Sequence, residues 1–449
     1  MLALEFPPVN STGAFRYLKF IKHLYNFGIK VTIIAPPADD LIQIHPYSKV
    51  DDTLLKGLPA DIDIIRVPLS EKAQYTIKEV TFKSKIRHYL NFKGDNLADS
   101  WHISLFNCVE KLVSTNRPDC IFVSLPPYSL GPLAAKIAGK FSIPLVADFR
   151  DEWSLNKSVP FPTILHYWYA KKMERFIFDY ANKVTIVTPQ LIQLFRKIHK
   201  QTFENKFELL TNGFDFDEVD FAKFSNKIAS SGEKFIIGYS GSFYYDPRSS
   251  ALSEKPFYKR PGIKKITYRQ SVTREDWSYR SPLYFIKALA FLFSRRPDLK
   301  NIIFFHHIGH LAPWLVNMIS EFELQNNFVS HGFLSKQENL LMQNNFNALL
   351  CTSEKVIDGE HYCLSSKVFD YIKMRKPILA FVTNGITKSF IEKCGCGIIC
   401  DPDNFEESSF AIEKLVTQSM QFYPDKDYLD QFLPDNLSKK LAFVIKEIV

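Results

Sequence analysis

Residues 119–153, DCIFVSLPPYSLGPLAAKIAGKFSIPLVADFRDEW, decide the fold of the first half of this 449-residue chain. The stretch contains two apolar, β-branched runs, Asp119 to Leu125 and Leu145 to Asp148, and the residues between them have the apolar spacing of a helix. A strand, a helix and a second strand in this order are typical of a parallel sheet covered by helices. The stretch therefore predicts an α/β fold.

Similar apolar runs recur through both halves of the chain, each followed by a stretch of helical period. The first residues also read as a strand that begins almost at once. The alternation predicts two Rossmann-like domains, each built on a doubly wound parallel sheet. The further strands that we expect are Lys30 to Ala35, Lys183 to Thr188, Phe207 to Leu210, Phe235 to Tyr239, Ile302 to Ile308, Phe328 to Phe333, Ala348 to Thr352, Pro377 to Val382 and Gly397 to Cys400.

A polar segment with little hydrophobic periodicity separates the two series of strands, and we place the domain junction there. Apolar residues at helical spacing near the C-terminus predict a closing amphipathic helix. The limits that we expect are 1–215 for the first domain, 216–233 for a linker, 234–427 for the second domain and 428–449 for the closing helix.

Composition limits the class of protein. Hydrophobic residues form 46% and charged residues 23% of the chain, which excludes a mostly disordered or fibrous protein. The longest apolar stretch, Pro282 to Phe293, is interrupted by Lys287 and is too short to span a bilayer, and the N-terminus lacks the basic leader of a secretory signal. Seven cysteines without framework spacing suit a reducing compartment. We therefore expect a cytoplasmic protein and leave open a peripheral contact with the inner face of the cell membrane.

Positive charge is concentrated in two stretches. The second domain carries a long insertion, 246–279, in which Lys255 to Arg274 holds seven Lys and Arg residues and no acid. Lys78 to Lys93 is also basic and aromatic. A formal net charge of +8 permits attraction to anionic lipid, for which these stretches offer surfaces, and the alternative is that the charge serves only solubility. The insertion is an alternative nucleic-acid site, but nothing else in the chain indicates that partner, and we do not expect it.

Two turns in the first domain place polar residues at strand ends. Asn10, Gly13 and Arg16 lie around a turn between a strand and a helix, where backbone N–H groups can receive a diphosphate or an acceptor oxygen. Tyr128 follows the strand that ends at Leu125 and should face the crevice where open α/β sheets bind ligands. We expect these four residues on the acceptor side. The alternative is that Gly13 serves only the backbone and that prolines shape the second turn.

A charged cluster follows the strand that begins at Leu145. Asp148, Arg150 and Asp151, with Glu152 beside them, gather where burial is costly without partners. We expect Asp148, Arg150 and Asp151 to be the catalytic residues. The alternative is a structural salt bridge of Arg150.

The second domain offers a candidate donor site. Small residues end the strand that begins at Phe235, so that the backbone can approach a phosphate, and a polar segment opens the helix near Lys367. A simpler interpretation of Lys367 and Asp370 is an ion pair within one helix. A simpler interpretation of His331 is a structural histidine held by a hydrogen bond. Cys394, Cys396 and Cys400 lack the partners of a metal site, so we expect no metal. The donor-binding residues that we expect are Gly241, Ser242, Arg248, Arg280, His331, Ser366, Lys367 and Asp370.

Taken in order, these elements resemble GT-B glycosyltransferases, and specifically the family 4 type of bacterial polysaccharide synthesis. The resemblance spans nearly the whole chain. Its motifs are Pro7-Pro8 with Gly13-Ala-Phe-Arg16, Ala147-Asp-Phe-Arg-Asp-Glu-Trp153, Leu210-Thr-Asn-Gly-Phe-Asp215, and Ser366-Lys-Val-Phe-Asp-Tyr371 with Lys376-Pro-Ile-Leu-Ala380.

The resemblance implies two facing Rossmann-like domains, a nucleotide-sugar donor in the second, a glycan or lipid-linked acceptor at the first, and transfer with retention, without a cofactor or an obligatory metal. The chain departs from the family's pair of glutamates seven residues apart, because Tyr362 stands at the first position and Asp370 at the second. Asp358 and Glu360 in the preceding loop are possible substitutes. The departure leaves an inactive nucleotide-sugar-binding or scaffold protein as the alternative function.

Overall fold

The computed structural model describes residues 1–9, 11–44, 50–56, 58–59, 61–70, 97–155, 164–199, 203–215, 217–227, 233–243, 246–247, 274–357 and 359–449. These residues form two compact units. The first unit comprises the described residues up to Asp215 together with Phe432–Val449, and the second comprises those from Asp217 to Gln431. The C-terminal segment therefore belongs to the first unit.

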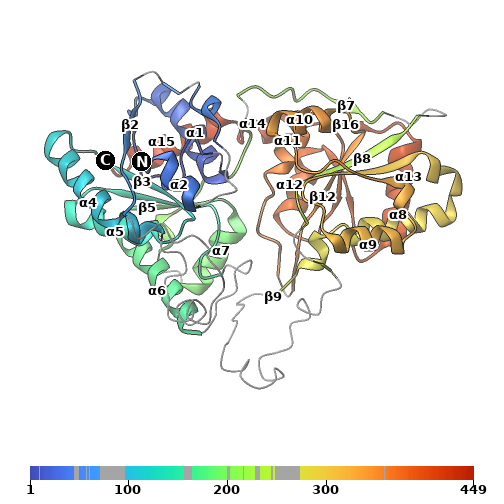
Figure 1. The fold of residues 1–449 in the computed structure, drawn as a ribbon, viewed down its shortest axis with the longest axis horizontal. Helices are drawn as coiled ribbons and strands as arrows, with labels where there is room; N and C mark the ends of the chain where they lie inside the picture. The colour runs from blue at the N-terminus through green and yellow to red at the C-terminus, as the bar shows by residue number, and fades with distance from the viewer. Residues whose placement is uncertain are drawn as a thin grey trace. The chain divides into compact units, whose positions relative to one another are not determined.

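The sheet of the first unit is parallel throughout (Figure 1). Leu2 bridges Ile34 and Val123, so the N-terminal residues connect the ladder β1–β2 to the ladder β3–β4–β5–β6. The expected N-terminal strand is therefore reduced to this bridge. The five other strands expected here are confirmed to within two residues at each end, whereas β2 was not predicted. The strands are β1 (Thr32–Ala35), β2 (Asp63–Arg66), β3 (Ile121–Leu125), β4 (Leu145–Phe149), β5 (Lys183–Ile186) and β6 (Phe207–Leu209).

Helices cover both faces of this sheet. Phe122 of β3 packs edge-on against Phe20 of α1, with ring centroids 6.1 Å apart, and the same core takes in Leu441 of α15. Leu125 lies three residues along the strand and so points to the other face, where it meets α5 at Gly131. The helices are α1 (Thr12–Leu24), α2 (Ala38–Ile44), α4 (Leu97–Thr115), α5 (Leu130–Phe141), α6 (Ile164–Tyr180), α7 (Pro189–Ile198) and α15 (Pro434–Lys446).

The second unit contains a six-stranded parallel sheet in the order β11-β10-β8-β12-β14-β15. Phe305 of β10 packs on Phe285 of α8, while its neighbour His306 faces Phe346 after α10, so this sheet is also covered on both faces. The strands are β8 (Phe235–Ser240), β10 (Ile303–Ile308), β11 (Phe328–Ser330), β12 (Ala348–Thr352), β14 (Ile378–Phe381) and β15 (Gly397–Cys400). All six were predicted, but β11 ends before His331, where Gly332 turns the chain with a φ of +68°.

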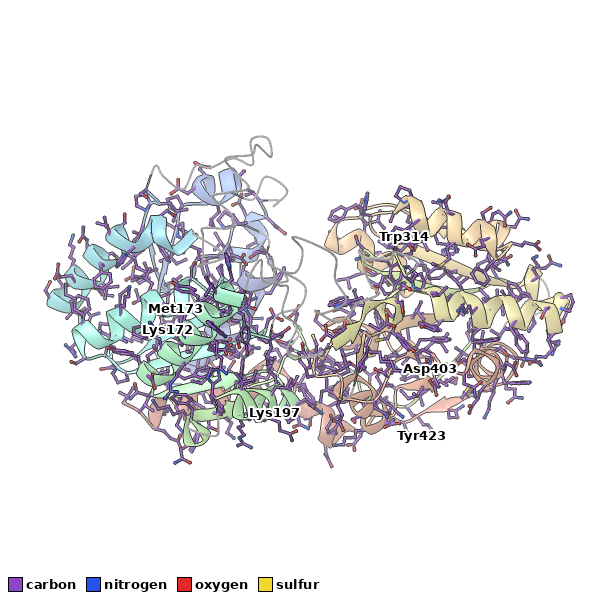
Figure 2. The ribbon with its side chains drawn as sticks, turned by 90° about the horizontal axis from the view of Figure 1, so that it is seen from below. Lys172, Met173, Lys197, Trp314, Asp403 and Tyr423 are labelled. Atoms are coloured by element: carbon purple, nitrogen blue, oxygen red, sulfur yellow. The ribbon has the colours of Figure 1, made fainter. Side chains whose placement is uncertain are left out.

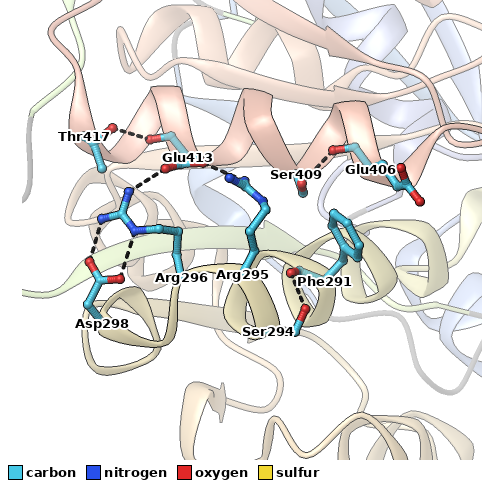
Figure 3. Close-up of polar contacts among 9 residues, drawn as sticks. All are labelled: Phe291, Ser294, Arg295, Arg296, Asp298, Glu406, Ser409, Glu413 and Thr417. Carbon is cyan, nitrogen blue, oxygen red and sulfur yellow. Dashed lines mark hydrogen bonds and ion pairs between the residues drawn. The ribbon is translucent and has the colours of Figure 1, made fainter.

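The helices of the second unit are α8 (Leu283–Arg295), α9 (Pro313–Glu321), α10 (Lys336–Asn344), α11 (Lys367–Lys373), α12 (Ile386–Cys394), α13 (Phe405–Thr417) and α14 (Lys426–Asp430). Two short antiparallel pairs complete it: β7 (Phe224–Ser225) with β16 (Gln421–Phe422), and β9 (Arg274–Asp276) with β13 (Lys355–Ile357). Figure 3 shows how α8 and α13 are joined, because Arg295 and Arg296 both donate to Glu413. None of the described helices is long and apolar enough to cross a membrane.

Close packing of β8 gives a stability prediction. A Cβ atom on Gly238 would lie 1.9 Å from Cδ2 of the fully buried Phe346. Gly238→Ala should therefore lower the free energy of unfolding by about 1–3 kcal/mol, as overpacking of a core does. Urea denaturation measures this. Gly359→Ala is the control, since its Cβ would meet only Val356 at 3.2 Å, and equal effects of the two variants would contradict the prediction.

Candidate donor and acceptor sites

Two glycine turns meet at the carboxyl ends of β8 and β10. Gly241 and Gly309 have φ values of +133° and +143°, a region that favours glycine. A Cβ on Gly309 would lie 2.5 Å from the carbonyl oxygen of Gly241, and the same oxygen lies 2.8 Å from Nε2 of His307. Next to them, Ser242 Oγ accepts a hydrogen bond from the backbone N–H of His310. The result is a strand-end surface formed by backbone, where the two turns pack against each other with no room for a Cβ atom between them.

Lys367 places a positive charge against this surface. Its Nζ atom donates to Tyr239 Oη at 3.2 Å, and a Cβ on Gly241 would lie 2.6 Å from the ammonium. The ammonium also sits 4.8 Å from the centroid of the Tyr239 ring, a cation–π distance. Ser366 directly precedes α11, and its side chain makes no capping hydrogen bond. Asp370 lies in the first turn of the same helix and is partly exposed.

Arg280 belongs to a charged network that sequence reasoning did not find. Glu354, after β12, lies 3.4 Å from Arg280 Nη1 and 3.2 Å from His361 Nε2. Burial opposes the charge of Glu354, but the charge and hydrogen bond of His361 and the charge of Arg280 together lower its pKa to about 2. Glu354 raises the pKa of Arg280 although burial acts in the opposite direction. Both groups are therefore charged at neutral pH.

The depressed pKa of Glu354 predicts a pH-dependent stability. An unfolded glutamate titrates near its ordinary value of 4.5, so the stabilisation is complete above that pH and declines as the pH falls toward 2. Its size is on the order of 3 kcal/mol. Glu354→Gln removes this contribution, so the difference in unfolding free energy between wild type and variant should shrink from pH 6 to pH 3. Glu360→Gln, at an exposed position, is the control; parallel curves for wild type and Glu354→Gln would contradict the assignment.

The histidines at the sheet edge form a neutral pair. His331 Nε2 lies 3.0 Å from Nδ1 of His306. Burial lowers the pKa of His331, and burial together with the charges of His331 and Lys234 lowers the pKa of His306 to about 4. The contact with His306 therefore agrees with the simpler interpretation, in which His331 is a structural histidine held by a hydrogen bond. The expected donor-binding residue Arg248 lies outside the described residues.

Tyr362, which stands at the first glutamate position of the resemblance described above, is held by a neighbouring strand. It is buried and its Oη atom donates to Oε1 of Glu275 in β9 at 3.0 Å. Glu360 is exposed, and Asp358 lies outside the described residues. Glu275 thus brings a carboxylate to Tyr362 from a distant segment, and no spacing in the sequence could have indicated this.

The structure encloses two of the residues predicted for the first unit's site. Asp148 was expected to be catalytic and Arg16 to face the acceptor, but Arg16 Nε and Nη2 each donate to the Asp148 carboxylate at 2.7 Å. Ser124 and Thr185 donate to it as well, and Asp148 is completely inaccessible. Arg16 also donates to the carbonyl oxygen of Leu210. In this structure Asp148 and Arg16 therefore form a buried ion pair, which is the structural alternative to their expected roles.

The remaining first-unit candidates meet at one sheet edge. A Cβ on Gly13 would lie 2.4 Å from Oε2 of Glu5 and 3.3 Å from Nη2 of Arg150. Arg150 donates to the carbonyl oxygen of Pro126, and the partly exposed Asp151 follows it directly. These residues bring opposite charges and the N-terminal end of α1 together at the carboxyl ends of β3 and β4. Asn10 lies outside the described residues.

Tyr128 contacts the loop that carries Asp151. Its Oη atom donates to the backbone carbonyl of Glu152 at 2.6 Å, and its ring stacks on Trp153 with centroids 5.3 Å apart. Among the described residues no group of three or more His, Cys, Asp or Glu side chains could hold a metal ion. Cys394 and Cys396 are buried thiols whose Sγ atoms donate to backbone carbonyls.

Comparisons with known proteins identify the architecture. No family model and no curated protein matches the sequence. The lipopolysaccharide outer core galactosyltransferase WaaB, in its apo form, is similar with a TM-score of 0.51 and 11% identity over 100% of this chain and 99% of that one. Alr3699/HepE of Anabaena, in complex with UDP, is similar with a TM-score of 0.51 and 12% identity over 100% and 96%.

A third similar structure is the N-terminal domain of trehalose-6-phosphate phosphatase from Candida albicans, with a TM-score of 0.50 and 13% identity over 100% of this chain and 92% of that one. Likeness at these identities concerns the fold. The chain has the GT-B architecture of two Rossmann-like domains, which confirms the predicted fold class. Since a domain of a phosphatase also shares the fold, the activity has to be argued from the site.

Proposed function

We propose that this protein is a glycosyltransferase whose second unit binds a nucleotide-sugar donor and whose first unit holds a glycan or lipid-linked acceptor. The observation that carries the proposal is the Lys367 ammonium lying against Gly241, beside Gly309, at the carboxyl ends of two parallel strands. Ligands of open α/β sheets bind at this edge. The neighbour that was solved with UDP and the neighbour described as a galactosyltransferase support this donor class.

The chemistry of transfer explains why cations are needed there. When the sugar leaves, negative charge accumulates on the nucleotide diphosphate, and pre-positioned cations stabilise that charge most effectively. Lys367 and Arg280 supply positive charge from two segments, and the glycine turns let the backbone approach phosphate oxygens. We therefore propose transfer without an obligatory metal or further cofactor, with retention of configuration, in cell-surface polysaccharide synthesis. In the first unit, Arg150 and Asp151 are the proposed contacts to the acceptor and the reacting sugar.

A donor panel tests the proposal. The purified chain is incubated with UDP-, GDP-, dTDP- and ADP-sugars, and released nucleotide is measured with and without glycan or lipid-linked acceptors. Release with one donor class, unaffected by EDTA, would support the proposal, and product NMR would give the anomeric outcome. Absence of both transfer and hydrolysis with all four donor classes would contradict it.

The alternative is a GT-B protein that binds a nucleotide sugar without turnover. The observation in its favour is Tyr362, which occupies the first glutamate position and is tied to Glu275. Calorimetric binding of a nucleotide by a chain that neither transfers nor hydrolyses would favour this function. Such a result would agree with the proposed donor site but would contradict the proposal that the protein catalyses sugar transfer.

An exposed apolar and basic helix face supports the proposed contact with an anionic membrane. Leu165 and Trp168 of α6 are 50% and 58% exposed, and Lys172 and Arg175 continue the same face at spacings of four and three residues. Figure 2 marks Lys172 on this helix. Aromatic and basic side chains together suit the boundary between lipid headgroups and acyl chains. The basic stretches Lys78 to Lys93 and Lys255 to Arg274 lie outside the described residues, except for Arg274 itself, which begins β9.

This surface predicts a loss of vesicle binding. Trp168→Ala should reduce cosedimentation with vesicles containing phosphatidylglycerol several-fold, because an exposed ring that enters the interface is removed. The matched control is Phe443→Ala, which removes a ring that is 64% exposed on α15 of the same unit. Binding that is equal for both variants, or independent of anionic lipid, would contradict the prediction.

A further inference from the structure

A buried carboxylate joins three elements of the first unit. Glu174 of α6 has no exposed surface, and its Oε2 atom accepts a hydrogen bond from Ser154 Oγ at 2.6 Å. Its Oε1 atom accepts from the backbone N–H of Ser154 at 3.2 Å, and Nε2 of His199 lies 2.7 Å from Oε2. Ser154 and His199 are only 2% and 5% exposed. The trio therefore connects the loop after β4, the middle of α6 and the end of α7.

The order of these contacts excludes a catalytic triad. A serine nucleophile needs its hydroxyl hydrogen bonded to the histidine that acts as base. Here the carboxylate lies between the two residues, so Ser154 donates to Glu174 and not to His199. The burial of all three side chains also keeps substrates away from them. The three residues therefore act by holding another part of the structure in place.

What it holds is the loop that carries the proposed acceptor-side residues. Residues 150–155 run from Arg150 through Asp151 to Leu155, and Trp153, Ser154 and Leu155 are buried. Tyr128 fixes the loop at Glu152, by a hydrogen bond and by stacking on the next residue. Glu174 fixes it at Ser154 through both the backbone and the side chain. The partly exposed Asp151 and Glu152 lie just before the second anchor.

Packing of the imidazole makes the second anchor rigid. The ring of His199 meets that of Phe178 edge-on at 5.1 Å and that of Phe203 at 6.2 Å. These contacts direct Nε2 at Oε2 of Glu174, the same oxygen that accepts the hydrogen bond from Ser154 Oγ, so histidine and loop share one carboxylate oxygen. A buried ion pair or charge-assisted hydrogen bond adds little net stability compared with apolar packing, but its geometry is specific. A contact with such specific geometry therefore fixes the orientation of the loop.

We propose that Glu174 is a positioning residue that acts through Ser154 to orient the loop 150–155 for the acceptor and the reacting sugar, with His199 fixing its carboxylate. The proposal rests on the proposed glycosyltransferase function for the role of the loop. The contacts themselves do not depend on that function. Because the donor site is assigned to the other unit, loss of the anchor should affect acceptor use and leave nucleotide affinity unchanged.

The test compares two serine-to-alanine changes in the same unit. Ser154→Ala removes a hydroxyl bonded to Glu174, whereas Ser438→Ala removes a buried hydroxyl that has no hydrogen-bond partner among the described residues. Hydrogen–deuterium exchange of peptides covering 150–155 should increase in Ser154→Ala and in Glu174→Gln, and stay unchanged in Ser438→Ala. With the donor identified by the panel, Ser154→Ala should lower kcat/KM for the acceptor about tenfold at unchanged nucleotide Kd, and Ser154→Thr should restore part of it.

The outcomes separate this inference from the proposed function. Unchanged exchange and unchanged acceptor kinetics in Ser154→Ala would overturn the positioning role. Equal losses of acceptor use, nucleotide affinity and thermal stability would overturn it as well, since they would indicate general unfolding. A wild-type chain that transfers no sugar would contradict the proposed function, and exchange at 150–155 would then decide alone whether Glu174 holds the loop.

Discussion

Replacing Lys367 with alanine is expected to lower the kcat of sugar transfer about 10²- to 10³-fold. The Lys367 ammonium is held by Tyr239 against the Gly241 turn, where the diphosphate of the donor is proposed to sit. Its charge acts on the diphosphate as the sugar leaves, so its loss should reduce kcat more than it weakens donor binding. Steady-state kinetics with the donor found by the panel measures both quantities. Lys367→Arg keeps the charge and should retain more activity than the alanine variant.

Lys234→Ala provides the matched control for Lys367→Ala. Lys234 also places its ammonium over an aromatic ring, 4.6 Å from the centroid of Phe304, but it lies at the opposite end of β8. Removing it lowers the net charge by the same amount and removes a cation–π contact, but leaves the carboxyl ends of β8 and β10 unchanged. If both variants lost activity equally, or if Lys367→Ala kept full kcat, the diphosphate would have to lie elsewhere.

Most strands of both sheets could be predicted because each has a recognisable run of apolar residues in its own sequence. Buried parallel strands such as β8 and β10 read as continuous apolar, β-branched runs, and both were found within one residue of their ends. β2 was missed because Asp63–Arg66 offers only two apolar residues between charged ones and none of the four is fully buried. β9 and β13 have only three residues each and are far apart in the sequence, so neither has a pattern that predicts the pairing.

The site was predictable only where the motifs that carry the chemistry are visible in the sequence and the fold fixes their place. The approach of Lys367 to Gly241 follows from two motifs that the fold places at one sheet edge. The Glu354 network joins segments around positions 280, 354 and 361, and the anchor at Glu174 joins positions 154, 174 and 199. Such contacts depend on packing between distant segments, which spacing in the sequence does not reveal.

Asp148 illustrates what the same reasoning leaves out. Its position at the end of a buried strand was correctly identified, and strand ends are where open sheets bind ligands. What the sequence did not disclose is that Arg16, 132 residues earlier, reaches the carboxylate from α1. An arginine and two hydroxyl groups surround the carboxylate, and the carboxylate and the arginine form a buried ion pair. Loss of this pair should therefore lower the stability of the fold.

Asp148→Ala is therefore expected to lower the free energy of unfolding by about 3–5 kcal/mol, because it leaves the buried Arg16 guanidinium without its counter-charge. Chemical denaturation followed by circular dichroism measures the change. Glu110→Ala is the control, because it breaks the ion pair with Lys140, in which both side chains are more than half exposed, and should cost at most about 1 kcal/mol. If Asp148→Ala kept its stability and lost sugar transfer, the structural assignment would be wrong, and Asp148 would have to be a catalytic residue.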